Sequence, residues 1–237
     1  SNDKGKTWNI VNNGLSDPDI RVFHIRNNKI FSGTSTGSSR SDNKGDLWRT
    51  ASEGLPKLAV ISIGSIYHIV FAGTNNSFAF GTLDAGDRWS QYKKGFTRPK
   101  VNAILGVGNS FFAGTDALPN QGNGGLHLTT DYGTTWKQVK NGLPVMNINT
   151  LAGNSSNLSV LGDSGFYNST DLGTTWSKSS WTVKVLYVNE RNNNEFVLLN
   201  SDIFRYTKNN GWSPVSPPAP KLNIQDIVEN GTTLFLA

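Results

Sequence analysis

Short apolar runs alternate along the chain with polar turns rich in Asn, Gly, Ser and Thr. The clearest apolar runs each end in a Gly-Thr pair, at Ile30–Thr34, Val70–Thr74 and Phe112–Thr115. β-Branched and aromatic residues favour strands, and the Gly and Asn residues between the runs favour tight hairpins. The pattern repeats after roughly 40 residues, so the sequence predicts an all-β chain whose units each contain four antiparallel strands.

One eight-residue segment recurs at the same place in each predicted unit, and its best copy is Ser169–Trp176. The copies share an Asp or Asn, a Gly and a Trp, here Asp3, Gly5, Trp8, Asn43, Gly45, Trp48, Asp84, Gly86, Trp89, Asp131, Gly133, Trp136, Asp171, Gly173 and Trp176. A sixth copy, at residues 205–212, keeps only the Trp and a displaced Gly. The spacings between the Trp residues are 40, 41, 47, 40 and 36, which indicates stacked or radially repeated units.

Each shared position of this segment has a local physical reason. The Asp or Asn side chain can accept hydrogen bonds from backbone N–H groups of its own turn, and the Gly permits a positive φ. The Trp begins the next strand with a large apolar ring whose N–H needs an acceptor. We therefore expect the segment to be a structural turn that closes a hairpin.

This pattern, Ser/Thr-x-Asp-x-Gly-x-Thr-Trp, resembles the Asp-box (BNR) repeat of sialidases, sortilin-type receptors, some xyloglucan hydrolases and a photosystem II assembly factor family. The resemblance implies a β-propeller of four-stranded antiparallel blades, in which the turn is structural and lies away from the ligand face. Arrays of Trp and Asn-Gly-Leu followed by Leu-Phe-x-Gly-Thr also resemble those of large secreted bacterial repeat proteins. That likeness implies an extracellular or cell-surface location.

A second repeated signature, a polar residue followed by Gly and then Leu or Phe, is expected where one blade crosses to the next. It occurs at 13–15, 53–56, 94–96 and 141–144. The chain begins in a turn between a third and a fourth strand and stops near Leu234, which aligns with a second strand. We therefore expect residues 1–237 to be one propeller domain from a longer chain, with six blades, one completed by both ends. An arc of a larger propeller is the alternative.

Composition excludes several functions. The net charge of +5 is spread over all units without a basic run, so no nucleic-acid partner is expected. No apolar run is long enough to insert into a membrane. The chain has no Cys, and its three His residues fall in different units, so neither a metal site nor a cofactor is predicted.

Two sets of residues are candidates for ligand binding. The 47-residue unit gains its extra length in a polar loop at residues 116–125, with Asp116, Asn120, Gln121 and Asn123 as contact candidates. A tolerated surface insertion is the alternative. The positions expected at the mouth of the channel, on the inner strands, are Arg21, Ile61, Asn102, Asn149, Lys184 and Asn223. They are either the lining of a water-filled channel or a site in which Arg21 and Lys184 hold an anion.

The resemblance to sialidases implies three arginines for the substrate carboxylate, a Tyr nucleophile activated by a Glu, and a separate Asp. The chain has no Arg-Ile-Pro motif, and Tyr187 with Glu190 is the nearest candidate pair. No catalytic residue is assigned, although 13 Asp residues leave a two-carboxylate glycosidase open. The sequence favours a non-enzymatic binding or scaffold module for a protein or glycan. A glycoside hydrolase of sialidase or xyloglucanase type and an assembly factor similar to the photosystem II propellers are the alternatives.

Overall fold

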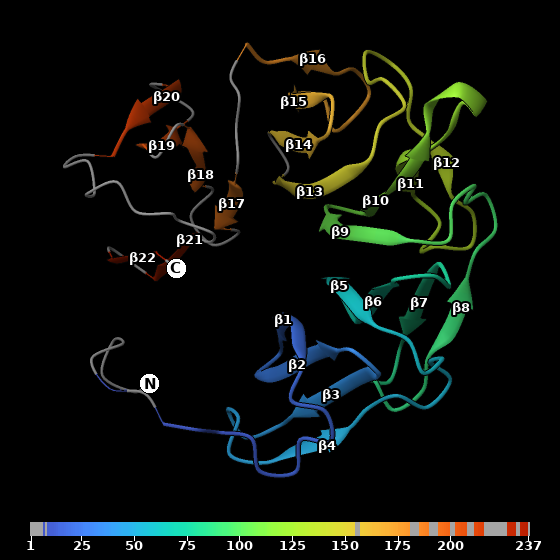
Figure 1. Ribbon diagram of the computed structural model, residues 1–237, viewed down its shortest axis with the longest axis vertical. Coiled ribbons are helices and arrows are strands. Elements are labelled where there is room, and N and C mark those ends of the chain that lie inside the picture. Colours follow the sequence, from blue (N-terminus) through green and yellow to red (C-terminus); the bar gives the residue numbers. More distant parts are fainter. Residues whose placement is uncertain are drawn as a thin grey trace. The chain divides into compact units, whose positions relative to one another are not determined.

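A computed structural model describes residues 7, 9–154, 157–180, 185–189, 194–199, 202–207, 211–215, 227–230 and 233–236. Within these ranges the chain forms 22 β-strands and a single 3-10 turn, η1 (Pro119–Gln121). All paired strands are antiparallel and consecutive in sequence (Figure 1). The prediction of an all-β chain with four-stranded antiparallel units is confirmed. The chain divides into two compact units, 1–93 with 99–101 and 94–98 with 102–237.

The first unit contains two four-stranded sheets. The strands are β1 (Ile20–Arg26), β2 (Lys29–Thr34), β3 (Gly37–Ser41), β4 (Trp48–Thr50), β5 (Val60–Ile66), β6 (Ile69–Thr74), β7 (Ala79–Thr82) and β8 (Ser90–Tyr92). Between the two sheets lies a core of seven buried side chains, namely Phe31, Val60, Ile63, Val70, Ala72, Phe80 and Trp89. The predicted strands at Ile30–Thr34 and Val70–Thr74 coincide with β2 and β6.

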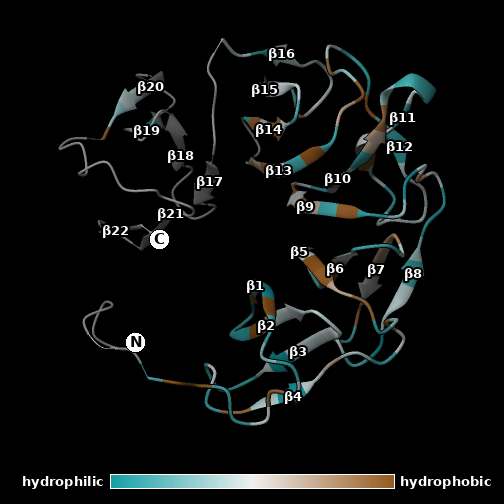
Figure 2. Cartoon of the chain, in the orientation of Figure 1, coloured by the Kyte–Doolittle hydropathy of each residue, from teal (hydrophilic) through white to brown (hydrophobic). Residues whose placement is uncertain are grey.

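The second unit contains three four-stranded sheets and one two-stranded sheet. Its strands are β9 (Val101–Val107), β10 (Ser110–Leu118), β11 (Asn123–Thr129), β12 (Lys137–Gln138), β13 (Ile148–Gly153), β14 (Leu158–Gly162), β15 (Gly165–Ser169), β16 (Ser177–Lys178), β17 (Val185–Asn189), β18 (Asn194–Leu199), β19 (Asp202–Thr207), β20 (Gly211–Pro214), β21 (Ile227–Asn230) and β22 (Thr233–Leu236). The core of its first two sheets includes Phe112, Leu126, Met146, Ile148 and Trp176. Hydrophobic residues are visible on the strands β5, β9 and β13 (Figure 2).

The repeated segment forms the turn between the third and fourth strands, as predicted. In the fourth copy, Asp131 Oδ1 accepts hydrogen bonds from Thr129 Oγ1 at 2.7 Å and from the Thr135 N–H at 2.9 Å, and the Gly133 N–H donates to Thr129 Oγ1 at 3.0 Å. The same contacts recur around Asn43, Asp84 and Asp171. We call these segments the repeat turns. The first copy, with Asp3, Gly5 and Trp8, lies outside the described residues.

The residue before the shared Gly also has a positive φ, which the sequence did not indicate. Tyr132 has φ 55° and Gly133 has φ 86°, so two successive residues adopt the left-handed conformation. The other non-Gly residues at this position are Lys44, Ala85 and Leu172. The hydrogen bonds of the Asp or Asn side chain offset the steric cost of this conformation.

The two repeated signatures contact each other directly. The carbonyl oxygen of the residue before each crossing Gly accepts a hydrogen bond from the backbone N–H of a repeat-turn Trp, as between Asn141 and Trp176 at 3.0 Å. A Cβ added at Gly142, whose φ is 76°, would lie 2.0 Å from the carbonyl oxygen of Trp176. The same pairing joins Asn13 to Trp48, Glu53 to Trp89 and Lys94 to Trp136. Each described crossing is thereby fixed to the fourth strand of the following sheet.

Candidate functional site

Residues 116–125, expected to be a loop, instead extend the hairpin of β10 and β11. The strands pair as far as Leu118 and Asn123, with a register shift between Gly114 and Ala117, and η1 closes the end. β-Ladder pairing therefore continues through a segment whose Gly content suggested irregular structure. None of the three residues of η1 is buried. The insertion is an ordered projection with an exposed tip, which we call the long hairpin.

The long hairpin is braced by hydrogen bonds from neighbouring segments. Gln138 Nε2 donates to the carbonyl oxygens of Gly122 at 3.0 Å and Gly124 at 2.6 Å. The Gly124 N–H donates to Thr97 Oγ1 at 2.8 Å. A side chain at Gly124, where φ is 88°, would lie 2.0 Å from the carbonyl oxygen of Asp116. Hydrogen bonds therefore hold the segment as far as Gly122, and Asn120 and Gln121 are exposed at its tip.

Two pairs of hydrogen-bonded polar side chains lie beside this hairpin, and the backbone of Ala117 links them. Asn102 Nδ2 donates to Asp116 Oδ1 at 2.9 Å and to the carbonyl oxygen of Ile148 at 3.0 Å. Asn147 Oδ1 accepts from the Ala117 N–H at 2.7 Å, and Asn147 Nδ2 donates to Asp163 Oδ2 at 2.8 Å. We call Asn102, Asp116, Asn147 and Asp163 the amide–carboxylate network. It joins the second-to-third strand connections of two neighbouring sheets.

The structure brings together one member of each predicted set, since Asn102 and Asp116 are in direct contact. Asn123 Nδ2 lies 3.4 Å from Gln121 Oε1 at the tip. Arg21 is in the other unit, where its Nη2 lies 2.6 Å from Asp19 Oδ2 in an ion pair that is about half exposed. Lys184 and Asn223 lie outside the described residues, so the anion site of Arg21 and Lys184 stays a prediction.

Three of the predicted inner-strand positions share a structural feature, because each lies at a register shift in its strand pair. The register shifts between Ile20 and Val22, between Val60 and Ser62, and between Ile148 and Thr150, so Arg21, Ile61 and Asn149 each occupy a bulge. A bulge re-aims the side chain of the extra residue, and bulges are frequent beside functional sites. The Asn149 side chain is exposed.

Sequence reasoning missed Asn147 and Asp163. The available signal for Asp163 was its place directly after a second strand, which matches the place of Asp116 after Thr115. For Asn147 the sequence carried no signal, because the residue lies on a crossing and meets Ala117 only through the packing of two sheets.

The carboxylates of two repeat turns have lowered pKa values. In the described part of the chain, no group of three or more His, Cys, Asp or Glu side chains is placed so that it could hold a metal ion. Hydrogen bonds from the Thr135 and Thr129 hydroxyls lower the pKa of Asp131 to about 2, and a similar set from Thr175 and Ser169 lowers that of Asp171 to about 2. These carboxylates stay ionised and serve their own turns. The proposed partner of Tyr187, Glu190, lies outside the described residues.

Comparison with known proteins identifies the fold and little else. No family model matches the chain, and no curated protein matches it. Among solved structures, the extracellular domain of the one component system BT4673 from B. thetaiotaomicron matches with a TM-score of 0.69 and 12% identity, over 92% of this chain and 31% of that one. The structure of YCF48 bound to D1 peptide matches with a TM-score of 0.69 and 16% identity, over 94% of this chain and 77% of that one. The GH74 xyloglucanase from Xanthomonas campestris matches with a TM-score of 0.64 and 12% identity, over 83% of this chain and 38% of that one.

The chain has a β-propeller fold. It spans about a third of the length of the BT4673 domain that it matches. Several neighbours are extracellular domains, one is bound to a peptide and others are GH74 enzymes, so the fold itself does not choose among binding, assembly and hydrolysis. In the described ranges, no helix has both the length and the apolar character needed to cross a bilayer.

Proposed function

We propose that the protein is a non-enzymatic binding module that uses the long hairpin and the adjoining amide–carboxylate network to hold a protein or glycan partner. The observation that carries the proposal is the braced hairpin, an insertion that neighbouring segments hold by hydrogen bonds and whose turn Pro119–Gln121 has no buried residue. A contact element already held in its bound shape loses little conformational entropy on binding, which favours affinity.

The side chains available at this surface support recognition by hydrogen bonding. Asn and Gln amides each offer two donors and an acceptor, and the carboxylates of Asp116 and Asp163 add acceptors. Hydroxyl-rich glycans and extended peptide backbones both match this chemistry. The YCF48 structure, which contains a bound peptide, is a precedent for a peptide ligand on this fold and favours the protein partner.

Three further parts of the proposal rest on the repeats. The hydrogen-bond pattern of the repeat turns supports membership of the Asp-box propellers. Residues 1–237 are proposed to be a single domain with six blades. An extracellular location is supported by the extracellular domains of B. thetaiotaomicron among the neighbours.

The test is a glycan array and a peptide array, each probed with the labelled protein and with a variant in which residues 117–123 are replaced by a two-residue Asn-Gly turn. Thermal unfolding of the variant controls for folding. The proposal expects ligands that the wild type binds and the variant loses.

Hydrolysis would overturn the proposal. Release of reducing sugar from xyloglucan oligosaccharides, or of sialic acid from sialyl-lactose, by the wild-type protein would make it a glycosidase. Binding that survives removal of the long hairpin would place the ligand elsewhere on the protein.

A further inference from the structure

The repeat turns differ in whether the side chain of the residue before the Trp makes a hydrogen bond within its own turn. In the turns of Asp131 and Asp171 this residue is Thr135 or Thr175, whose hydroxyl donates to the Asp carboxylate at 2.5 or 2.6 Å. In the first described turn it is Leu47, whose side chain is 52% exposed. This turn therefore lacks a stabilising hydrogen bond and presents an aliphatic side chain to solvent.

Two arginines flank this exposed Leu. Arg40 is the residue of β3 before the turn, and Arg49 follows the Trp on β4. The corresponding positions in the other described turns hold Gly81, Leu128 and Asn168, and Ser90, Lys137 and Ser177. Among the described turns, only the first combines two arginines with an exposed aliphatic side chain.

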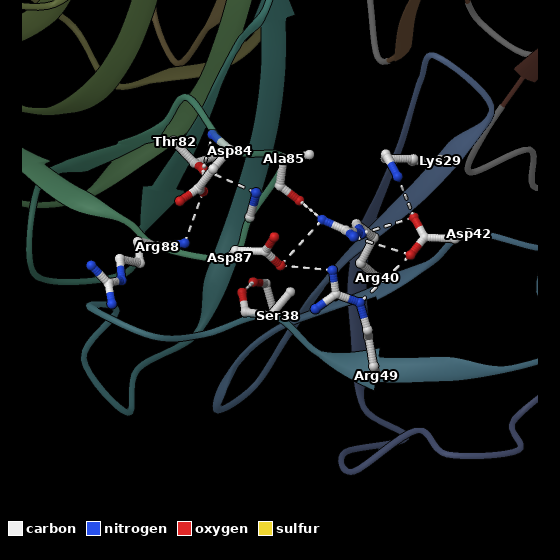
Figure 3. Close-up of polar contacts among 12 residues, drawn as sticks. Lys29, Ser38, Arg40, Asp42, Arg49, Thr82, Asp84, Ala85, Asp87 and Arg88 are labelled. Atoms are coloured by element: carbon white, nitrogen blue, oxygen red, sulfur yellow. Dashed lines mark hydrogen bonds and ion pairs between the residues drawn. The ribbon is translucent and has the colours of Figure 1, made fainter.

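Arg40 is fixed in place by a dense set of contacts (Figure 3). Its Nη2 donates to Asp42 Oδ2 at 3.0 Å, its Nε lies 3.0 Å from Asp42 Oδ1 without hydrogen-bond geometry, and its Nη1 donates to the carbonyl oxygen of Ala85. The side chain is only 6% exposed. Arg40 therefore supplies a buried positive charge at a fixed position and has few donors left for a ligand.

Arg49 is the cation that can meet a ligand. Its Nη2 donates to Asp87 Oδ1 at 2.6 Å and its Nε lies 3.5 Å from Asp42, but its Nη1 makes no hydrogen bond within the described part of the chain. Its side chain is 46% exposed. Lys29 also pairs with Asp42, at 2.7 Å. Within the described ranges, Lys29, Arg40 and Arg49 form ion pairs only with Asp42 and Asp87, so three cations share two carboxylates in this cluster.

A hollow of about 160 Å³ lies against this cluster, and it is lined by Arg40, Asp42, Asn43, Leu47, Trp48 and Arg49. Pockets for drug-sized ligands measure roughly 300–1,000 Å³, so this space suits a single side chain. Leu47 and Trp48 form its apolar part. The hollow thus combines a small apolar surface with a half-exposed guanidinium.

We propose that this hollow, the Arg49 hollow, binds an extended peptide segment of a partner protein that carries an aliphatic side chain beside a carboxylate. The aliphatic side chain packs against Leu47 and Trp48. The carboxylate accepts a hydrogen bond from Arg49 Nη1 and becomes the third carboxylate beside the three cations. This contact is separate from the long hairpin, and neither surface depends on the other.

The probe is a fluorescein-labelled octapeptide, Gly-Ser-Leu-Glu-Leu-Glu-Ser-Gly, titrated with the whole chain at low ionic strength and followed by fluorescence anisotropy. Matched peptides carry Gln in place of both Glu, or Ala in place of both Leu. The proposal expects each change to weaken binding about tenfold, since each removes one of the two contacts. Added salt weakens binding of the parent peptide more than binding of the Gln peptide.

Two variants test the residues, and a third is the matched control. Arg49→Gln and the double change Asn43→Asp with Leu47→Thr are each expected to weaken the parent peptide about tenfold. The double change rebuilds the Asp–Thr pair found in the turns of Asp131 and Asp171. The variant is therefore expected to unfold at a higher temperature and to bind the peptide more weakly. Arg88→Gln removes a still more exposed cation from the next turn and is expected to leave binding unchanged.

Three results would overturn the proposal. The first is an absence of saturable binding of the parent peptide. The second is equal binding by the wild type, Arg49→Gln and the double variant. The third is a wild-type dimer in sedimentation that the double variant dissolves, which would assign the Arg49 hollow to a second copy of the chain.

Discussion

The pairing of each crossing with a repeat-turn Trp makes a quantitative prediction for Gly142→Ala. The Gly142 backbone has φ 76°, and an added Cβ would lie 2.0 Å from the carbonyl oxygen of Trp176. The left-handed conformation alone costs a non-Gly residue about 1–2 kcal/mol. The clash adds to this cost because the crossing has to move away from the buried Trp176, which is 5% exposed.

Movement of the crossing breaks the hydrogen bond from the Trp176 N–H to the carbonyl oxygen of Asn141, which is 3.0 Å long. Leaving such a buried group without a partner costs about 1–3 kcal/mol. The total expected loss in the free energy of unfolding for Gly142→Ala is therefore about 2–5 kcal/mol.

The matched control is Gly108→Ala. Gly108 belongs to the same unit and also has a positive φ, 57°, but a Cβ at this position would meet nothing within 4 Å. Gly108→Ala is expected to cost only the conformational part, about 1–2 kcal/mol. Urea unfolding followed by Trp fluorescence measures both variants, and equal slopes with urea are required for the comparison. Equal losses for the two variants would show that the crossing does not depend on contact with Trp176.

Other predictions concern the His residues, the repeat turn and Arg40. Burial lowers the pKa of His24 from 6.5 to about 4, with Arg26 adding to the effect, and burial lowers that of His127 to about 4 against a smaller opposing effect of the Gly125 backbone. Between pH 6.5 and 4 the unfolded chain therefore binds protons that the folded chain does not. The contribution of each ring to the free energy of unfolding is complete above pH 6.5 and falls by at most about 3 kcal/mol as the pH drops toward 4. Urea titrations at stepped pH measure this loss. His127→Leu is expected to reduce that pH dependence and to raise the urea midpoint at pH 5, because the ring is fully buried and neither nitrogen meets hydrogen-bond geometry in the described part of the chain; an unchanged pH profile would contradict the assignment. Asp131→Asn is expected to cost about 1 kcal/mol in thermal unfolding through loss of the Thr135 hydroxyl bond, and Asp131→Ala is expected to cost more because it also removes the bonds to Oδ1. Arg40→Ala is expected to lower the free energy of unfolding in urea by about 1–3 kcal/mol. The loss is smaller than for a fully buried pair because Asp42 and Asp87 are 43% and 52% exposed and regain water. An unchanged urea midpoint would show that the cluster contributes no stability.

The repeat made most of the fold predictable. Asp131, Gly133 and Trp136 occupy fixed places in a segment that recurs, so the turn, the strand after it and the crossing could each be located from the sequence. The left-handed residue before the Gly could not, because Lys44, Ala85, Tyr132 and Leu172 share no side-chain property that marks it.

The candidate site was predictable in part. The extra length near Asp116 pointed to the long hairpin, but its Gly residues suggested a loop, and backbone pairing between Leu118 and Asn123 overrode that local signal. Asn147 belongs to the amide–carboxylate network only because two sheets pack together, and no local pattern records such a contact. The pairing of Asn141 with Trp176 has the same origin, since the two residues are adjacent only in space.

The measurement that tests the proposed function most directly is the affinity of a ligand identified on the arrays for three forms of the protein. These are the wild type, the double variant Asn120→Ala with Gln121→Ala, and the control Asn109→Ala at the opposite end of the same sheet. If the long hairpin presents the binding surface, the double variant binds about tenfold or more weakly, and the control binds as the wild type does. Equal affinity of all three forms, or turnover of the ligand by the wild type, would contradict the account.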